Sequence, residues 1–301
     1  MPPGEVVIMR ESVLSIHDLS ISFPAGKHRT TPVRSVSFDV RKGEILGIVG
    51  ESGSGKSLSC LAVAGLLPAT AQASGAVAIG GQTFAAADLP KALASKRLPP
   101  IGMIFQEPVS CLNPVRSVGE QIAEAARSAG HSAEQARKIA LQLLKDVAID
   151  EPETRYHDYP SQFSGGMCQR VMIATALALA PQLIIADEPT TALDVTVQAQ
   201  VVSLLVSLVR QRGIAMIFIS HDLDLIAEVC DRIVVMYGGE IMEVGTTENI
   251  YARPSHPYTR LLLNAMPGHG EPLTRLVEMP HDWRLDAAAS LTSATSAERL
   301  S

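Results

Sequence analysis

"GESGSGKS", Gly50 to Ser57, is the stretch that decides the fold, because it matches the pattern G-x-x-x-x-G-K-[ST] of a phosphate-binding loop. The apolar run "EILGIVG" before it has the length of a buried strand, and the helix-forming run "SLSCLAVAGLL" follows it. Glycines let backbone N–H groups converge on a phosphate at the positive end of a helix. Strand, loop and helix in this order predict a nucleotide-binding site.

A second part of this site follows a later strand, because a magnesium-phosphate site also needs a carboxylate at the end of a neighbouring strand. "LIIADE" supplies Asp187 and Glu188. We predict that Lys56 bridges the β- and γ-phosphates, and that Ser57 and Asp187 hold Mg²⁺. Glu188 is predicted to act as general base on the attacking water. An Asp-Glu pair is otherwise common at a solvated sheet edge, and its combination with the loop favours ATP hydrolysis.

Strand-like and helix-like segments alternate around the loop, which predicts an α/β fold with a parallel sheet covered on both faces. Antiparallel hairpins are predicted for residues 14–40, for "GAVAIGGQTF" and for "RIVVMYGGEIMEVG". A helix is predicted for residues 195–212, with Gly213 after its end. We expect residues 1–245 to form one ATPase domain and residues 246–301 to form a C-terminal extension, whose composition predicts poor order from Pro267 onward.

Composition narrows the class of protein. With 301 residues and a net charge of −6, the chain lacks the basic footprint of a nucleic-acid-binding protein. Its longest apolar region, residues 171–186, is interrupted by Thr175 and Pro181 and is too short for a membrane span. The N-terminal segment has no pattern of a secretion signal, which predicts a cytoplasmic protein. The spacing of the cysteines predicts reduced thiols: Cys60, Cys111, Cys168 and Cys230.

With "FSGGM" (Phe163 to Met167) and "LIIADEPTTALD" (Leu183 to Asp194) added to the loop, the chain resembles the nucleotide-binding subunits of ATP-binding-cassette (ABC) transporters. The resemblance covers residues 12–267. It implies a P-loop NTPase ABC cassette with a RecA-like core sheet, an antiparallel β subdomain and an inserted α-helical subdomain. Apolar residues recurring every three or four positions between Glu107 and Ala180 are typical of such a helical insertion.

The resemblance also implies the roles of individual residues. Gln106 in "IFQEP" is expected to be a third Mg²⁺-binding residue and to sense the γ-phosphate through that ion, as part of the catalytic set. His221 in "FISHD" is expected to hold that phosphate and orient water with Glu188. Phe23 is expected to stack on adenine, although a phenylalanine in a strand is more often part of a core. The loop and the resemblance together predict ATP contacts at Phe23, Gly50, Ser52, Gly53, Ser54, Gly55, Lys56, Ser57, Leu58 and Asp187.

A second glycine turn belongs to "FSGGM", and one nucleotide needs only one phosphate cradle. In ABC proteins two cassettes meet head to tail, so the resemblance implies that Ser164, Gly165 and Gly166 contact the ATP of a partner, with Asp194 of the "TALD" segment nearby. A second ATPase subunit is therefore expected, as a related but distinct chain. Two membrane permeases, facing residues 108–118, and an extracytoplasmic substrate-binding protein are the other expected partners; nucleic acid is not.

Further segments, above all "RPSHPYTRLLLNAMP" (Arg253 to Pro267), resemble the peptide, nickel and opine importer group. The expected function is ATP hydrolysis that energises uptake of peptides or related small solutes, by a peripheral subunit on the cytoplasmic face of the inner membrane. The chain departs from the group at Cys168, where arginine or glutamine is usual. Two outcomes are open: the change is neutral, because the serine and glycines make the contacts, or a side chain near the dimer interface weakens the partner geometry. No cysteine follows Cys230, so no iron–sulfur cluster is expected.

Three other functions compete with that of an importer. An ABC-type ATPase of a soluble assembly, such as a phosphonate-degrading enzyme complex, is the alternative, and only the "HPYT" segment argues against it. An ATPase of DNA repair or translation usually carries a coiled-coil insertion, zinc cysteines or two cassettes. A scaffold that binds ATP without hydrolysis is disfavoured because both Glu188 and His221 are present.

Overall fold

A computed structural model of the chain describes residues 11–25, 28–190 and 194–265. The chain divides into two compact units, residues 1–259 and 260–301, and the sheets and sites described below lie in the first. The predicted poor order from Pro267 onward concerns residues outside this description.

The larger sheet has six strands in the order β10-β9-β3-β8-β7-β6. They are β3 (Ile45–Val49), β6 (Ile101–Ile104), β7 (Leu183–Asp187), β8 (Ala215–Ile219), β9 (Arg232–Tyr237) and β10 (Glu240–Thr246). All neighbours are parallel except β9 and β10, which form the predicted hairpin. Every residue of β3 and β8 is buried, which explains why both strands are continuously apolar in sequence. The parallel sheet is confirmed.

The smaller sheet is antiparallel, in the order β2-β1-β4-β5. Its strands are β1 (Ser12–Ala25), β2 (His28–Arg41), β4 (Gln72–Ile79) and β5 (Gln82–Ala85). The two predicted hairpins in this part of the chain are therefore confirmed. One hydrophobic cluster includes Ile16 and Ile21 of this sheet together with Ile48 and Ile217 of the larger one. The two sheets thus share a core.

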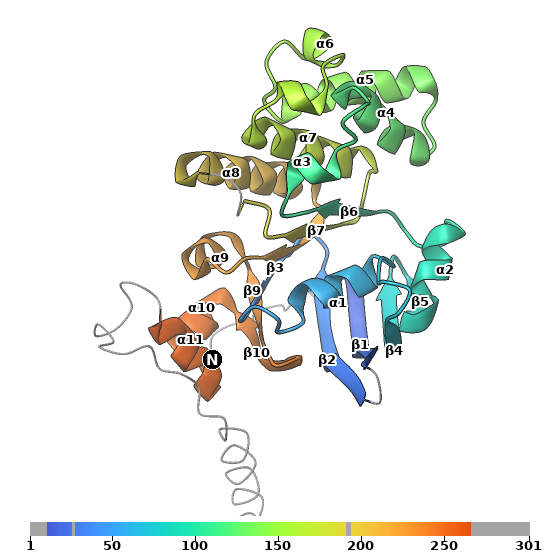
Figure 1. Cartoon of the computed structure of the whole chain (residues 1–301). Helices are drawn as coiled ribbons and strands as arrows, with labels where there is room; N and C mark the ends of the chain where they lie inside the picture. The colour runs from blue at the N-terminus through green and yellow to red at the C-terminus, as the bar shows by residue number, and fades with distance from the viewer. Residues whose placement is uncertain (1–10, 26–27, 191–193, 266–301) are drawn as a thin grey trace, which may run out of the picture. The chain divides into compact units, whose positions relative to one another are not determined.

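The described part of the chain also contains the helices labelled in Figure 1. They are α1 (Lys56–Val63), α2 (Leu89–Ala94), α3 (Pro108–Cys111), α4 (Val118–Ser128), α5 (Ala133–Asp146), α6 (Pro152–Arg155), α7 (Gly165–Ala178), α8 (Val195–Arg212), α9 (Leu223–Val229), α10 (Thr247–Ala252) and α11 (Pro257–Asn264). Helices α4, α5 and α7 pack on one another and form the predicted helical insertion. Helix α8 ends at Gly213 in a left-handed conformation, as predicted. Across the described residues, no helix has both the length and the apolar character needed to cross a membrane.

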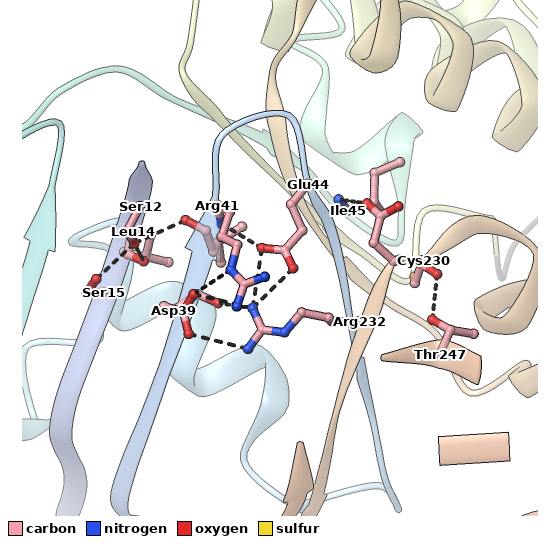
Figure 2. Close-up of polar contacts among 12 residues, drawn as sticks. Ser12, Leu14, Ser15, Asp39, Arg41, Glu44, Ile45, Cys230, Arg232 and Thr247 are labelled. Atoms are coloured by element: carbon pink, nitrogen blue, oxygen red, sulfur yellow. Dashed lines mark hydrogen bonds and ion pairs between the residues drawn. The ribbon is translucent and has the colours of Figure 1, made fainter. Parts of the chain in front are cut away.

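An ion cluster ties the smaller sheet to the larger one (Figure 2). Arg232, the first residue of β9, places Nη1 3.1 Å from Oε1 of Glu44 and 3.3 Å from Oδ2 of Asp39 on β2. Glu44, next to β3, is only 2% exposed. Burial by itself would lower the pKa of Arg232, but the Glu44 and Asp39 carboxylates outweigh it and raise that pKa. The guanidinium therefore stays charged and compensates the buried Glu44.

Replacing Arg232 by methionine is expected to lower the free energy of unfolding by about 3 kcal/mol, because it leaves the buried Glu44 without its cation. Arg34→Met is the matched control. The Arg34–Glu240 pair is 3.4 Å long with side chains 45% and 43% exposed, so its loss should cost less than about 1 kcal/mol. Urea unfolding of both variants measures the difference, and equal losses would contradict the importance of the buried cluster.

Candidate active site

The phosphate-binding loop connects β3 to α1 and closes around its own lysine. Nζ of Lys56 donates to the carbonyls of Gly50 at 2.7 Å and Glu51 at 2.8 Å, and the residue is 7% exposed. Gly50 has φ 146°, and a Cβ atom there would lie 2.0 Å from the carbonyl oxygen of Met236. Only glycine fits this position, so the close approach of the loop to β9 depends on it.

A cavity of about 260 Å³ opens at this loop. Its lining consists of Pro32, Ser52, Gly53, Ser54, Gly55, Lys56, Ser57, Leu58 and Glu188. Except for Gly50, the structure thus gathers all the predicted contact residues of the loop around one space, together with the predicted base. Pro32, on β2, was not predicted, because no local pattern in β2 marks one residue as facing a loop that comes later in the chain.

Two of the three residues predicted to hold Mg²⁺, Ser57 and Asp187, meet at the end of β7. Oγ of Ser57 donates to Oδ1 of Asp187 at 2.9 Å. The pKa of Asp187 is raised, first by burial and also by the Glu188 carboxylate. The hydrogen bond from Ser57 and the charge of Lys56 oppose this rise. A hydroxyl and a carboxylate are the hard oxygen donors that Mg²⁺ prefers, and Mg²⁺ binds proteins through few side chains. The pair therefore fits the ion.

Glu188 and His221 lie together at the ends of β7 and β8. Glu188 has a left-handed backbone with φ 48°, and its N–H donates to the carbonyl of Ile219 at 3.0 Å. Its Oε2 is 3.6 Å from Nδ1 of His221, whose side chain is 66% exposed. Burial lowers the pKa of Lys56, whereas the charges of Glu188 and Asp187 oppose this. The Glu188 carboxylate thus acts on the loop lysine as well as on the histidine.

Two other predicted site residues, Gln106 and Phe23, have less support from their contacts. Gln106 lies two residues beyond β6, whose Ile104 is paired with Ala186 next to Asp187, so the strand end is in the right place. Its exposed side chain makes no hydrogen bond to any residue within the described ranges. Phe23 is partly buried and packs against the hydrophobic cluster of the two sheets. That contact favours a role in the core and leaves adenine stacking a prediction.

The predicted partner-facing motif begins α7. Oγ of Ser164 accepts from the Met167 N–H at 3.3 Å, while Ser164 and Gly165 are both exposed. A cavity of about 460 Å³ opens beside them. Its lining consists of Ala148, Ile149, Asp150, Arg155, Ser164, Gly166, Met167, Arg170, Val197 and Gln200. It shares no residue with the phosphate-loop cavity, as a head-to-tail pair of cassettes requires. Its two arginines were missed by sequence reasoning, since neither belongs to a motif.

Helix α8 starts directly against this motif. A Cβ atom at Gly166 would lie 2.7 Å from Cγ1 of Val197, so glycine allows the two helices to approach closely. Asp194 caps α8, because its Oδ1 accepts from the Val197 N–H at 3.0 Å. Asp194 therefore lies near the start of α7, and its contact with nucleotide stays a prediction. The preceding residues 191–193 of the "TALD" segment are outside the described ranges.

The structure bears on the two outcomes left open for Cys168. Its side chain is fully buried, and Sγ lies 3.6 Å from the carbonyl oxygen of Pro160. Burial also raises the pKa of the thiol. Of the two alternatives, this burial favours a neutral change, because the helical period turns the Cys168 side chain into the chain while Ser164 and Gly165 face outward. All four cysteines are free thiols.

Comparison with known proteins agrees with this site. The profile of the family described as "ABC transporter" matches residues 33–191, and that of "Oligopeptide/dipeptide transporter, C-terminal region" matches residues 242–287. The probable peptide ABC transporter ATP-binding protein y4tR of Sinorhizobium fredii is 45% identical over 275 residues, which are 89% of this chain and 81% of that protein. The dipeptide transport ATP-binding protein DppD of Haemophilus influenzae is 46% identical, over 88% of this chain and 81% of its own length.

Solved structures agree as well. The dimeric ATP-binding cassette MJ0796, in a post-hydrolysis state with ADP and Pi, has a TM-score of 0.67 and 29% identity, and the match covers 78% of this chain and 98% of that one. A structure of cbiO1 from Clostridium perfringens, with a TM-score of 0.68 and 23% identity over 94% of this chain and all of that one, shares the fold. On these grounds the chain belongs to the ABC transporter family, as one of its ATPases.

Proposed function

We propose that this chain hydrolyses ATP to energise the uptake of peptides or related small solutes through partner permeases. The observation that supports it most directly is the match of residues 242–287 to the oligopeptide/dipeptide transporter C-terminal region. Relatives named for peptide and dipeptide transport, each matched over 81% of its length, support the same substrate class. The soluble alternative, a cassette in a phosphonate-degrading complex, has no observation in its favour here.

In the proposed reaction, Lys56 exchanges the carbonyls of Gly50 and Glu51 for oxygens of the β- and γ-phosphates. The backbone N–H groups of the loop and the start of α1 then surround the phosphates. Ser57 and Asp187 would hold Mg²⁺, which supplies positive charge to the phosphate oxygens when bound. Glu188 takes the proton of the attacking water, and His221, 3.6 Å from Glu188, helps to orient it.

A second ATPase chain completes each nucleotide site in this proposal. The exposed Ser164 lies, with Gly166, on a cavity separate from this chain's own phosphate loop, which supports the proposal that the start of α7 serves a phosphate held by another chain. A serine-capped helix start suits that role, because its free N–H groups attract anions. We propose a related but distinct chain as this partner, with the pair attached to the cytoplasmic face of the inner membrane.

The permease contact is proposed for residues 108–118, where the chain leaves β6 for the helical insertion. Two large apolar side chains of this segment are unusually exposed, Val109 at 58% and Val115 at 79%. Exposed apolar side chains that gather in one patch are typical of a surface that another protein covers, and these two lie six residues apart in one short segment. An amphipathic segment on the cytoplasmic side of a membrane protein has the matching chemistry.

The test is purification of the tagged full chain from detergent-solubilised membranes of its own host, followed by mass spectrometry and ATPase assays. We expect two multispanning permeases and a second cassette ATPase in stoichiometric amounts. ATP hydrolysis by the captured complex, placed in lipid nanodiscs with its substrate-binding protein, should rise on addition of a dipeptide mixture. A mixture of free amino acids of the same composition is the matched control.

Two results would contradict this function. Companions that are all soluble enzymes would move the phosphonate-complex alternative ahead of the importer. A membrane complex whose ATP hydrolysis responds to nickel or an opine, and not to dipeptides, would leave the importer standing and change its substrate class.

A further inference from the structure

The segment around "SHPYT", Ser255 to Thr259, has no place in the reaction described so far, yet it is held firmly. The carboxylate of Glu243, on β10, accepts from the Ser255 N–H at 2.8 Å and from the His256 N–H at 3.0 Å. Nδ1 of His256 in turn accepts from the Tyr258 N–H at 3.1 Å. These bonds fix the first turn of α11 against β10 and fix the position of Tyr258.

Tyr258 is a large, buried side chain with an unusual hydroxyl. It is 2% exposed, and its ring lies 4.6 Å from the ring of Tyr237, the last residue of β9. Its hydroxyl has no partner at full hydrogen-bonding geometry among the residues that the structure describes. Burying a hydroxyl without a hydrogen-bond partner costs free energy. The position of the Tyr258 hydroxyl therefore needs a functional or structural explanation.

The hydroxyl of Tyr258 lies next to the phosphate-binding loop. Burial raises the pKa of Tyr258 to about 12, the Glu51 carboxylate adds to the rise, and the backbone N–H of Glu51 opposes it. The Glu51 amide is thus close to the tyrosine oxygen, although the two do not form a hydrogen bond at full geometry in this structure. The approach follows from the fold, because Gly50 touches the backbone of Met236 and the next residue of β9, Tyr237, stacks on Tyr258.

One peptide group connects this tyrosine to the loop lysine. The peptide between Gly50 and Glu51 offers its carbonyl to Nζ of Lys56 at 2.7 Å, and its N–H lies near the Tyr258 hydroxyl. When a triphosphate competes for Lys56, this carbonyl loses its donor. Without a second hold the peptide is free to rotate, and rotation would turn the neighbouring N–H groups away from the phosphates.

We propose that Tyr258 is a positioning residue for ATP: its hydroxyl accepts a hydrogen bond from the Glu51 N–H and holds the Gly50–Glu51 peptide in place as Lys56 moves to the phosphates. The inference rests on the proposed phosphate site. It gives the C-terminal extension a part in nucleotide binding, through one contact with the loop. A single hydrogen bond of this kind contributes about 0.5–1.5 kcal/mol, which corresponds to an affinity change of about 2- to 12-fold.

The experiment measures binding of a fluorescent ATP analogue with Mg²⁺ to the full chain and to three variants. Tyr258→Phe is expected to weaken binding about 2- to 12-fold without lowering the melting temperature, since the lost hydroxyl has no full partner in this structure. Tyr156→Phe is the matched control: that tyrosine is also buried, but its hydroxyl donates to Glu120 at 2.7 Å in the helical insertion. Tyr156→Phe should have a lower melting temperature than the wild type and an unchanged affinity for the ATP analogue. Lys56→Ala should bind at least about 100-fold more weakly.

Hydrogen exchange of the peptide containing Glu51 provides a readout that a purely structural role would not move. In the presence of nucleotide its amide should exchange faster in Tyr258→Phe than in the wild type. Wild-type affinity in Tyr258→Phe, or equal weakening in Tyr156→Phe, would overturn the inference. Normal binding by Lys56→Ala would instead overturn the proposed phosphate site, so the two failures are distinguishable.

Discussion

Replacing Glu188 by glutamine is expected to leave ATP binding intact and to slow turnover at this chain's phosphate loop by a factor of about 100 to 10,000. The amide keeps the size of the carboxylate and its place after β7, but it cannot take a proton from water. His221, 3.6 Å from the Glu188 carboxylate, is then left to orient a water that no base activates. Bound ATP should accumulate, and the pair of cassettes should stay closed.

Photolabelling with 8-azido-ATP measures this for each chain separately. In the assembled complex, Glu188→Gln should retain a γ-phosphate label that the wild type loses, while an α-phosphate label marks both equally. Glu228→Gln is the matched control, because Glu228 is an exposed glutamate on α9. If Glu188→Gln lost the γ-label as fast as the wild type, the assignment of the base would be wrong, and so would the preference for an enzyme over a scaffold.

Much of this site could be predicted from the sequence, because its chemistry is arranged locally. A run of apolar residues, a glycine loop and a helix follow one another within residues 45–63, and the structure forms β3, the loop and α1 from them. Asp187 lies at the end of an apolar run in the same way, and its contact with Ser57 needed only the assumption that both strands belong to one sheet.

The remainder depends on contacts between distant parts of the chain. β9 was predicted only as half of a hairpin, but it also pairs in parallel with β3, and that neighbour cannot be read from β9 itself. Pro32 lines the cavity because strand β2 of the smaller sheet passes beside the loop. Tyr258 lies near Glu51 because its ring packs on Tyr237, the last residue of β9. The burial of Cys168 could have been read from local periodicity, because successive residues of a helix face different directions and Cys168 lies four residues after the exposed Ser164.

A bulky residue at position 165 is expected to act only on the partner's nucleotide. Gly165 is the first residue of α7, exposed beside Ser164, so tryptophan there leaves this chain's phosphate loop unchanged and keeps the second cassette from closing. Without closure the donors of α7 do not reach the partner's phosphates. Loss of such preorganised donors costs about 100-fold or more in turnover.

Ala133→Trp is the matched control, because Ala133 is also exposed and is the first residue of α5 after a capping serine. Both variants should bind the ATP analogue normally when isolated. In the assembled complex, Gly165→Trp alone should leave the γ-label of 8-azido-ATP on the partner chain.

Gly166→Val separates this effect from a defect inside the chain. Its Cβ would meet Val197 at 2.7 Å, so it should lower the melting temperature of the isolated subunit, which Gly165→Trp should not. If the partner chain released its γ-label normally in Gly165→Trp, these glycines would not serve a second nucleotide. The separate cavity beside α7 would then need another ligand.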